Sequence, residues 1–173
     1  MARTLSRNRE RGFTLLELMI VIVLVGIMAT FSLASYQKMT QAKNIENDLS
    51  KITRFIKAGR VWAFTHKQEV TVSLLKEGTS GDKHTTIVSR WDDAGTGTDT
   101  QKEVVLNYIY ASNYGSDSFS ITSRGNLANG HIRLLADNRE TALSNPAATG
   151  DCITINNIRV RQGKYDGTSC TAE

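Results

Sequence analysis

The sequence RGFTLLELMIVIVLVGIMATFSLASYQK occupies residues 11–38 and decides the fold. Its first seven residues contain two charges, Arg11 and Glu17, whereas the twenty positions from Leu18 to Gln37 contain none. A helix of about twenty residues rises about 30 Å, which is the thickness of the hydrocarbon core of a bilayer. The stretch therefore predicts a helix that is long and apolar enough to span a membrane.

Three interpretations of this apolar stretch are open. A secretory signal peptide would use residues 32–34 (Ser-Leu-Ala) as its cleavage site, but the apolar run is longer than such peptides usually have. A signal anchor would keep its basic end in the cytoplasm. It would also leave Glu17 inside a membrane helix, where a carboxylate at the centre costs roughly 2.5–3.5 kcal/mol and one near an end costs less. The third interpretation uses Gly12, Phe13 and Glu17 together.

The motif GFTLLELMIV at residues 12–21 resembles the amino-terminal signature of type IV pilins and type II secretion pseudopilins. The resemblance implies that a prepilin peptidase cleaves after Gly12 on the cytoplasmic face and that the new amino terminus, Phe13, is N-methylated. Glu17 then lies four residues after Phe13, on the same helix face. In a filament, its carboxylate neutralises the amine of a neighbouring subunit in a nearly dry core, where opposite charges attract more strongly than in water. Glu17 is thus predicted to set the register of filament assembly.

The positive charge of the chain is concentrated in the predicted leader, residues 1–12. The leader contains four arginines and one glutamate, so residues 13–173 keep about one of the four net positive charges of the chain. This flank indicates a cytoplasmic amino-terminal end by the positive-inside rule and does not indicate nucleic-acid binding. We therefore expect residues 13–37 to form a single inner-membrane span, later the filament core, with the remainder of the chain in the periplasm.

Residues 38–66 continue the helical pattern but are amphipathic. Charged residues lie mostly on the other faces, whereas an apolar stripe recurs every three or four positions at Ile45, Leu49, Ile52, Ile56 and Ala63, with Gly59 in the same stripe. Such a stripe needs a cover. We expect this half of the helix to pack against a sheet.

Residues 67–173 contain short runs with the two-residue alternation of β-strands. Strands are predicted at 70–74, 84–90, 103–110, 118–123, 131–136 and 152–161, with glycine-rich connections between them. Short strands with such connections favour a mostly antiparallel sheet. The predicted fold class is α+β, a long amino-terminal helix packed on a mostly antiparallel β-sheet domain, which is the pilin fold that the resemblance implies.

Four blocks are similar to the GspH/FimT branch of minor pilins and pseudopilins: IKAGRVWA at 56–63, HKQEVTV at 66–72, SFSITSRGN at 118–126 and ITINNIRVR at 153–161. The FimT subset binds DNA for natural transformation through a carboxyl-terminal arginine motif. The resemblance extends this role to Arg159 and Arg161, which would share one side of a strand, and the nearby Lys164 adds a third cation for phosphates. Ile158 stands where the branch usually has glycine, and a solvated strand face with ordinary charges is the alternative.

Cys152 and Cys170 are the two cysteines of the chain. In an exported domain a disulfide between them is permitted, and by the chain-entropy model a loop of about nineteen residues would add on the order of 3 kcal/mol. Two free thiols are the alternative, and their spacing does not fit zinc. His66, His84 and His131 are scattered, and the sequence has no catalytic or phosphate-binding motif. We therefore predict a protein that is not an enzyme and that uses no metal or cofactor.

The sequence thus predicts a structural minor pilin or pseudopilin subunit, located at or near the tip of a filament. Its partners would be the prepilin peptidase, other pilin or pseudopilin subunits and the inner membrane. Two alternatives are a DNA-binding minor pilin of the FimT type and a signal-anchored periplasmic binding module. The choice between a type IV pilus and a type II secretion pseudopilus stays open.

Overall fold

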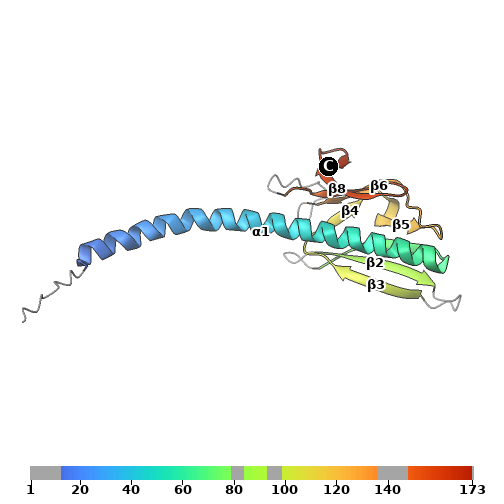
Figure 1. Cartoon of the computed structure of the whole chain (residues 1–173), viewed down its shortest axis with the longest axis horizontal. Helices are drawn as coiled ribbons and strands as arrows, with labels where there is room; N and C mark the ends of the chain where they lie inside the picture. Colours follow the sequence, from blue (N-terminus) through green and yellow to red (C-terminus); the bar gives the residue numbers. More distant parts are fainter. Residues whose placement is uncertain (1–12, 79–83, 93–98, 136–147, 173) are drawn as a thin grey trace, which may run out of the picture. The chain divides into compact units, whose positions relative to one another are not determined.

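The computed structural model describes residues 13–78, 84–92, 99–135 and 148–172. Helix α1 runs from Leu15 to His66 and extends over two compact units, Met1–Lys38 and Met39–Glu173. The strands of the described residues, β1 to β9, all belong to the second unit (Figure 1).

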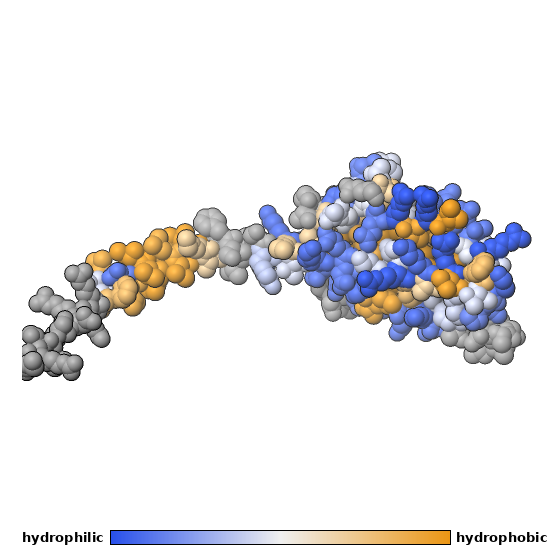
Figure 2. All heavy atoms as spheres, viewed as in Figure 1, coloured by the Kyte–Doolittle hydropathy of each residue, from blue (hydrophilic) through white to orange (hydrophobic). Residues whose placement is uncertain are grey.

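The described part of the first unit is mainly the beginning of α1. No helix among the described residues combines the length and the hydropathy that a membrane crossing requires. The large apolar side chains from Leu15 to Met28 are all exposed, from 49 % at Val21 to 79 % at Leu15. Figure 2 shows the visible face of this segment as predominantly hydrophobic. A helix that is apolar all round is a helix that other molecules normally bury.

The second half of α1 confirms the predicted apolar stripe. Its members are fully buried: Ile45, Leu49, Ile52, Ile56 and Ala63. Gly59 lies in the same stripe opposite strand β5 (Ser118–Ile121), where an added Cβ would lie only 3.2 Å from Cδ1 of Ile121. The missing side chain therefore permits β5 to approach the helix closely.

Four strands form the first sheet. Their order is β3 (Asp99–Val105), β2 (His84–Asp92), β1 (Val70–Glu77) and β5, and all neighbours are antiparallel. Along β1, alternate side chains are buried, and Val70, Val72 and Leu74 join one core cluster with the stripe of α1. This alternation is the pattern that predicted the strand.

Five strands form the second sheet, which is also antiparallel throughout. Their order is β4 (Tyr110–Ser112), β6 (Gly130–Leu134), β7 (Cys152–Ile155), β8 (Val160–Tyr165) and β9 (Cys170–Ala172). Inward residues of this sheet, including Ile132 and Ile153, belong to the same core cluster as the first sheet and α1. The predicted α+β class with antiparallel strands is confirmed, and the strands are divided between two sheets.

The prediction of one strand over residues 103–110 is wrong. Strand β3 ends at Val105, and β4 begins at Tyr110 in the other sheet. Between them, the main-chain N–H groups of Asn107 and Tyr108 donate to Oδ2 of Asp48 on α1, at 2.7 and 3.2 Å. The buried carboxylate replaces a neighbouring strand as the hydrogen-bond acceptor, so the chain can leave one sheet and enter the other.

The prediction of one strand over residues 152–161 is also wrong, because β7 and β8 form a hairpin there. Asn156 and Arg159 exchange two main-chain hydrogen bonds, of 2.8 and 3.1 Å, which close a loop consisting of Asn157 and Ile158. Asparagine is a frequent turn residue. Nη1 of Arg60 on α1 also donates to the carbonyl oxygen of Ile158 at 2.7 Å. The short strand β9 was not predicted.

Candidate functional site

The amino-terminal end of α1 is closed by a side-chain cap. Oγ1 of Thr14 accepts the main-chain N–H of Glu17 at 3.2 Å, and the carbonyl oxygen of Thr14 accepts the N–H of Leu18 at the same distance. A threonine at the N-cap with a glutamate three residues later is the capping-box pattern. A carboxylate in the first turn also interacts favourably with the helix dipole. The sequence analysis missed this cap, although the spacing of Thr14 and Glu17 was sufficient to find it.

The predicted assembly residues lie at this helix end. Phe13 and Glu17 are both exposed. The cap uses the main-chain N–H of Glu17, and within the described residues its carboxylate has no hydrogen-bond or ion-pair partner. Gly12 and the rest of the predicted leader lie outside the described residues. The cleavage site and the methylation of Phe13 therefore stay predictions.

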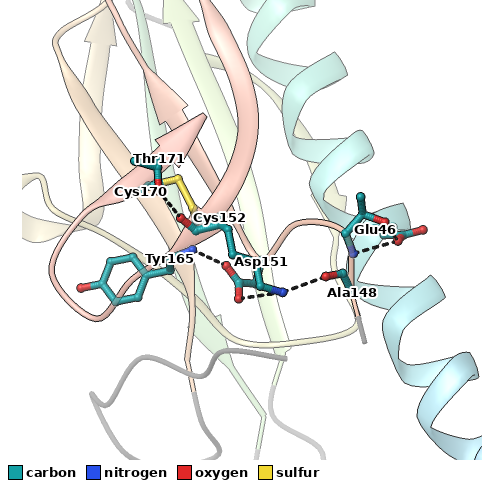
Figure 3. A network of polar contacts seen from close by, with 9 residues as sticks. Glu46, Ala148, Asp151, Cys152, Tyr165, Cys170 and Thr171 are labelled. Atoms are coloured by element: carbon teal, nitrogen blue, oxygen red, sulfur yellow. Dashed lines mark hydrogen bonds and ion pairs between the residues drawn. A yellow bond between two sulfur atoms is a disulfide. The ribbon is translucent and has the colours of Figure 1, made fainter. Parts of the chain in front are cut away.

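The two cysteines are joined in a disulfide at the carboxyl-terminal end of the second sheet. Cys152 is in β7 and Cys170 is in β9, and their Cα atoms are 6.0 Å apart (Figure 3). Opposite Cys152 in β8 stands Gly163, where an added Cβ would collide with the carbonyl oxygen of Thr171 in β9. The glycine and the disulfide together hold the last strand close to β8.

A buried carboxylate stabilises the segment that enters β7. Asp151 is fully buried, and its Oδ1 accepts the main-chain N–H of Tyr165 at 2.7 Å. Nζ of Lys164 lies 3.6 Å from its Oδ2 and donates to the carbonyl oxygen of Ala148 at 2.7 Å. Figure 3 shows these contacts between the strand and the preceding segment. Lys164 therefore stabilises the segment before β7 by binding its main chain and the carboxylate of Asp151.

The same segment is tied to α1 by Glu46. Its Oε1 accepts the hydroxyl of Thr149 at 2.6 Å and the N–H of Thr149 at 3.2 Å, and Nζ of Lys43 lies 3.2 Å from its Oε2. Hydrogen bonds from Thr149, aided by Lys43, lower the pKa of Glu46 to about 2. The carboxylate is thus a fixed negative acceptor that holds residues 148–151 against the helix of the second unit.

The three cations predicted to bind DNA do not form one patch. Arg159 closes the β7–β8 loop, and Arg161 stands in β8 opposite Thr154. Lys164 lies three residues further along β8, so its side chain faces the opposite side of the sheet from Arg161, where it is engaged with Ala148. Arg159 and Arg161 are both exposed. Arg159 directly precedes β8, whereas Arg161 lies within it, and a shared DNA-binding face for the two arginines stays a prediction.

Comparison with known proteins agrees with the amino-terminal motif. Residues 7–33 match a family model described as the prokaryotic N-terminal methylation motif. Two proteins of Pseudomonas aeruginosa, both called fimbrial protein, are 30 % identical to the chain over 73 residues. The match covers 42 % of this chain and 47 % of each relative, so the chain spans about half the length of the curated relatives it matches. No solved structure gives a significant match. The motif and the relatives support a type IV pilin-like protein.

Proposed function

We propose that this chain is a minor pilin or pseudopilin subunit that is made as a membrane-anchored prepilin and then assembled into a filament. The observation that carries the proposal is the coincidence of the methylation motif with the start of α1. Thr14 caps the helix, so Phe13 lies just outside it and Glu17 lies in its first turn. Gly12 directly precedes Phe13 in the sequence, so a peptidase that cuts after this glycine would free Phe13 as the new amino terminus.

Assembly would follow from the exposed surface of the first unit. Its apolar side chains are exposed in the isolated chain, and a surface of this size is normally covered by lipid or by other protein. Lipid would cover it before assembly, and the helices of neighbouring subunits would cover it afterwards. The unpaired carboxylate of Glu17 would then be penalised unless a cation met it. The amine of Phe13 from a neighbouring subunit supplies that cation once the leader is removed.

The first test is the mass of the full chain extracted from membranes of cells that contain the prepilin peptidase. Loss of residues 1–12 with gain of one methyl group is the expected result. A chain that keeps its leader, or one cut after Ala34, would refute the proposal. The uncut chain would favour a signal-anchored periplasmic module, in which the sheet domain works alone.

The second test separates the charge of Glu17 from its place in the helix cap. Glu17→Gln removes the charge but keeps the size of the side chain. Glutamine is also favoured at this position of a capping box. We expect this variant to be processed normally and to be absent from sheared filaments. The matched control, Thr14→Ala, weakens the cap and keeps the charge, so it should still enter filaments. Equal incorporation of Glu17→Gln and the unaltered chain would contradict the charge-pairing role.

The sequence blocks at 56–63, 66–72, 118–126 and 153–161 support the proposal that this chain is a minor pilin or pseudopilin, and a location at or near the tip is part of that proposal. Deletion of the gene should reduce filament number or secretion without removing the major subunit from the cell. Loss of pilus filaments alone would favour a type IV pilus, and loss of secretion alone would favour a pseudopilus.

DNA binding is a second candidate, supported by the exposure of Arg159 and Arg161. Two exposed arginines can hold phosphates without reading the sequence of bases. A mobility-shift assay at increasing salt should show weaker binding for the pair Arg159→Ala and Arg161→Ala. If the pair binds as well as the unaltered chain, these arginines do not bind DNA.

A further inference from the structure

A groove of about 530 Å³ lies in the second unit between α1 and the outer part of the first sheet. Both tryptophans of the chain line it, Trp62 from α1 and Trp91 from β2, with their ring centroids 4.7 Å apart. Phe55 and Val104 extend the apolar lining. The sequence analysis treated the tryptophans as core or cover residues, and the structure leaves both partly open to this groove.

The polar part of the groove is positive. Three cations line it, Lys51, Arg54 and Lys102, and no carboxylate is among the lining residues. Lys51 lies 3.5 Å from Asp48, which is buried below it. Arg54 and Lys102 are exposed and have no ion-pair partner in the described part of the chain. Apolar walls beside unpaired cations are complementary to a ligand that carries both apolar groups and carboxylates.

One wall of the groove is the free edge of a sheet. Among the described strands, β3 pairs only with β2. The register places Ser89 opposite Lys102, and the N–H of Leu106 donates to Thr85 on the β2 side. The alternation of an antiparallel pair then directs the main-chain groups of Gln101, Glu103 and Val105 away from β2. In agreement, the carbonyl oxygen of Val105 accepts a hydrogen bond from Nζ of Lys51, at 3.4 Å, and does not bond to β2.

We propose that β3 and this groove bind an extended segment of a partner protein that adds a strand beside β3. Such a strand would bond to the outward main-chain groups of Gln101, Glu103 and Val105. Its alternate side chains would face the groove, with a carboxylate opposite Lys102 and an apolar group opposite Val104. The surface does not depend on the filament proposal, because it is defined by residues of the second unit alone.

Two other occupants fit less well. Stacking of a nucleobase on Trp62 is obstructed, because the His66 ring stacks on it at 4.3 Å and Trp91 lies at 4.7 Å. A second copy of this chain would pair β3 with β3. Antiparallel self-pairing centred on Lys102 or on Glu103 sets like charges directly opposite each other, which is destabilising.

The test uses the full chain in mild detergent and two eight-residue peptides. In the first peptide, threonine alternates with aspartate and leucine. In the second, lysine replaces aspartate. Because both tryptophans line the groove, their fluorescence reports its occupation. We expect saturable binding of the acidic peptide and at least about tenfold weaker binding of the basic peptide. Amide exchange should slow at Gln101, Glu103 and Val105.

Two variants locate the binding surface. Lys102→Glu should reverse the preference between the two peptides. Glu103→Pro removes an outward N–H without removing a bond to β2, so it should abolish binding, whereas the matched control Glu103→Thr should retain it. Circular dichroism verifies that each variant is folded. If Glu103→Pro is unfolded, the peptide preference of Lys102→Glu alone decides whether the proposal holds.

Three outcomes would overturn the proposal. The first is no saturable response to the acidic peptide. The second is binding that Lys102→Glu leaves unchanged. The third is occupation of the same surface by another molecule, seen as self-association that Lys102→Glu alters or as oligothymidine that competes with the peptide.

Discussion

Replacement of Asp48 by alanine is expected to lower the free energy of unfolding by about 2 kcal/mol. Asp48 is fully buried and accepts the N–H of Asn107 at 2.7 Å, Nδ2 of Asn107 at 2.8 Å and the N–H of Tyr108 at 3.2 Å. Alanine removes the acceptor from two main-chain donors, and each such loss costs about 1–3 kcal/mol when the donor is buried. Asn107 is exposed, so water can replace part of the lost acceptor. Burial raises the pKa of Asp48, which means that its charge is costly to bury, and alanine removes that cost. Both effects keep the expected loss of unfolding free energy near the lower end of the range for two donors.

The measurement is urea unfolding of the full chain, followed by the fluorescence of the two tryptophans in the same unit. Asp48→Asn is the matched control, because its oxygen can still accept from the N–H groups while the buried charge is gone. It should lose less than about 1 kcal/mol. Since the pKa of Asp48 is raised in the folded chain, its protonation favours folding below its ordinary value of 3.8, and this contribution is lost as the pH rises through the raised pKa. Asp48→Asn should remove that dependence. An alanine variant as stable as the asparagine variant would refute the assigned role.

Three further predictions concern contacts made by the carboxyl-terminal residues 148–172. The pKa of Glu46 is lowered to about 2 by Thr149, so its contribution to stability is present above pH 4.5 and is lost as the pH falls toward 2. The urea midpoint of Glu46→Gln should therefore change less over this pH range than that of the unaltered chain. The same pH dependence in both proteins would contradict this. Cys152→Ser with Cys170→Ser should lose on the order of 3 kcal/mol in urea unfolding, and the unaltered chain under reducing agent should match it. Gly163→Ala should lose about 1–3 kcal/mol and accelerate amide exchange in β9, and normal exchange there would show that the strand tolerates a side chain.

The sequence predicted correctly the features that depend on residues close together in the chain. The stripe from Ile45 to Ala63 is visible in the sequence because helical residues three and four apart share a face. The motif at 12–17 is contiguous, so its family resemblance needed no knowledge of the fold. The cap formed by Thr14 was equally visible and was missed because Glu17 was interpreted only as a charge for assembly.

The division into two sheets was not visible, because residues distant in the sequence produce it. Asp48 lies three residues after Ile45 and four before Ile52, at the edge of the apolar stripe, but the sequence analysis grouped it with the charged residues of the other faces. Its carboxylate is in fact buried and accepts main-chain donors from residues 107 and 108, which ends β3 and lets β4 join the other sheet. Asn107 is the local indication of this break, but the residues on both sides of it favour a strand. The hairpin at Asn156 had a local indication in its two asparagines, but the alternating run around it favoured a continuous strand.

The cations of the second unit show why a count of basic residues overestimates a binding surface. Lys164 donates to the carbonyl oxygen of Ala148, and Arg60 donates to Gly125 at 2.8 Å and to Ile158 at 2.7 Å. Each of these side chains donates to main-chain oxygens of residues that lie outside the described helices and strands. A cation held in this way has some of its donors engaged and its position fixed within the domain, so it is less available to bind a phosphate or carboxylate. Candidate ligand-binding cations are therefore those without such acceptors, and this criterion favours Arg54 and Lys102 in the groove, and Arg159 and Arg161 on the hairpin, over Lys164.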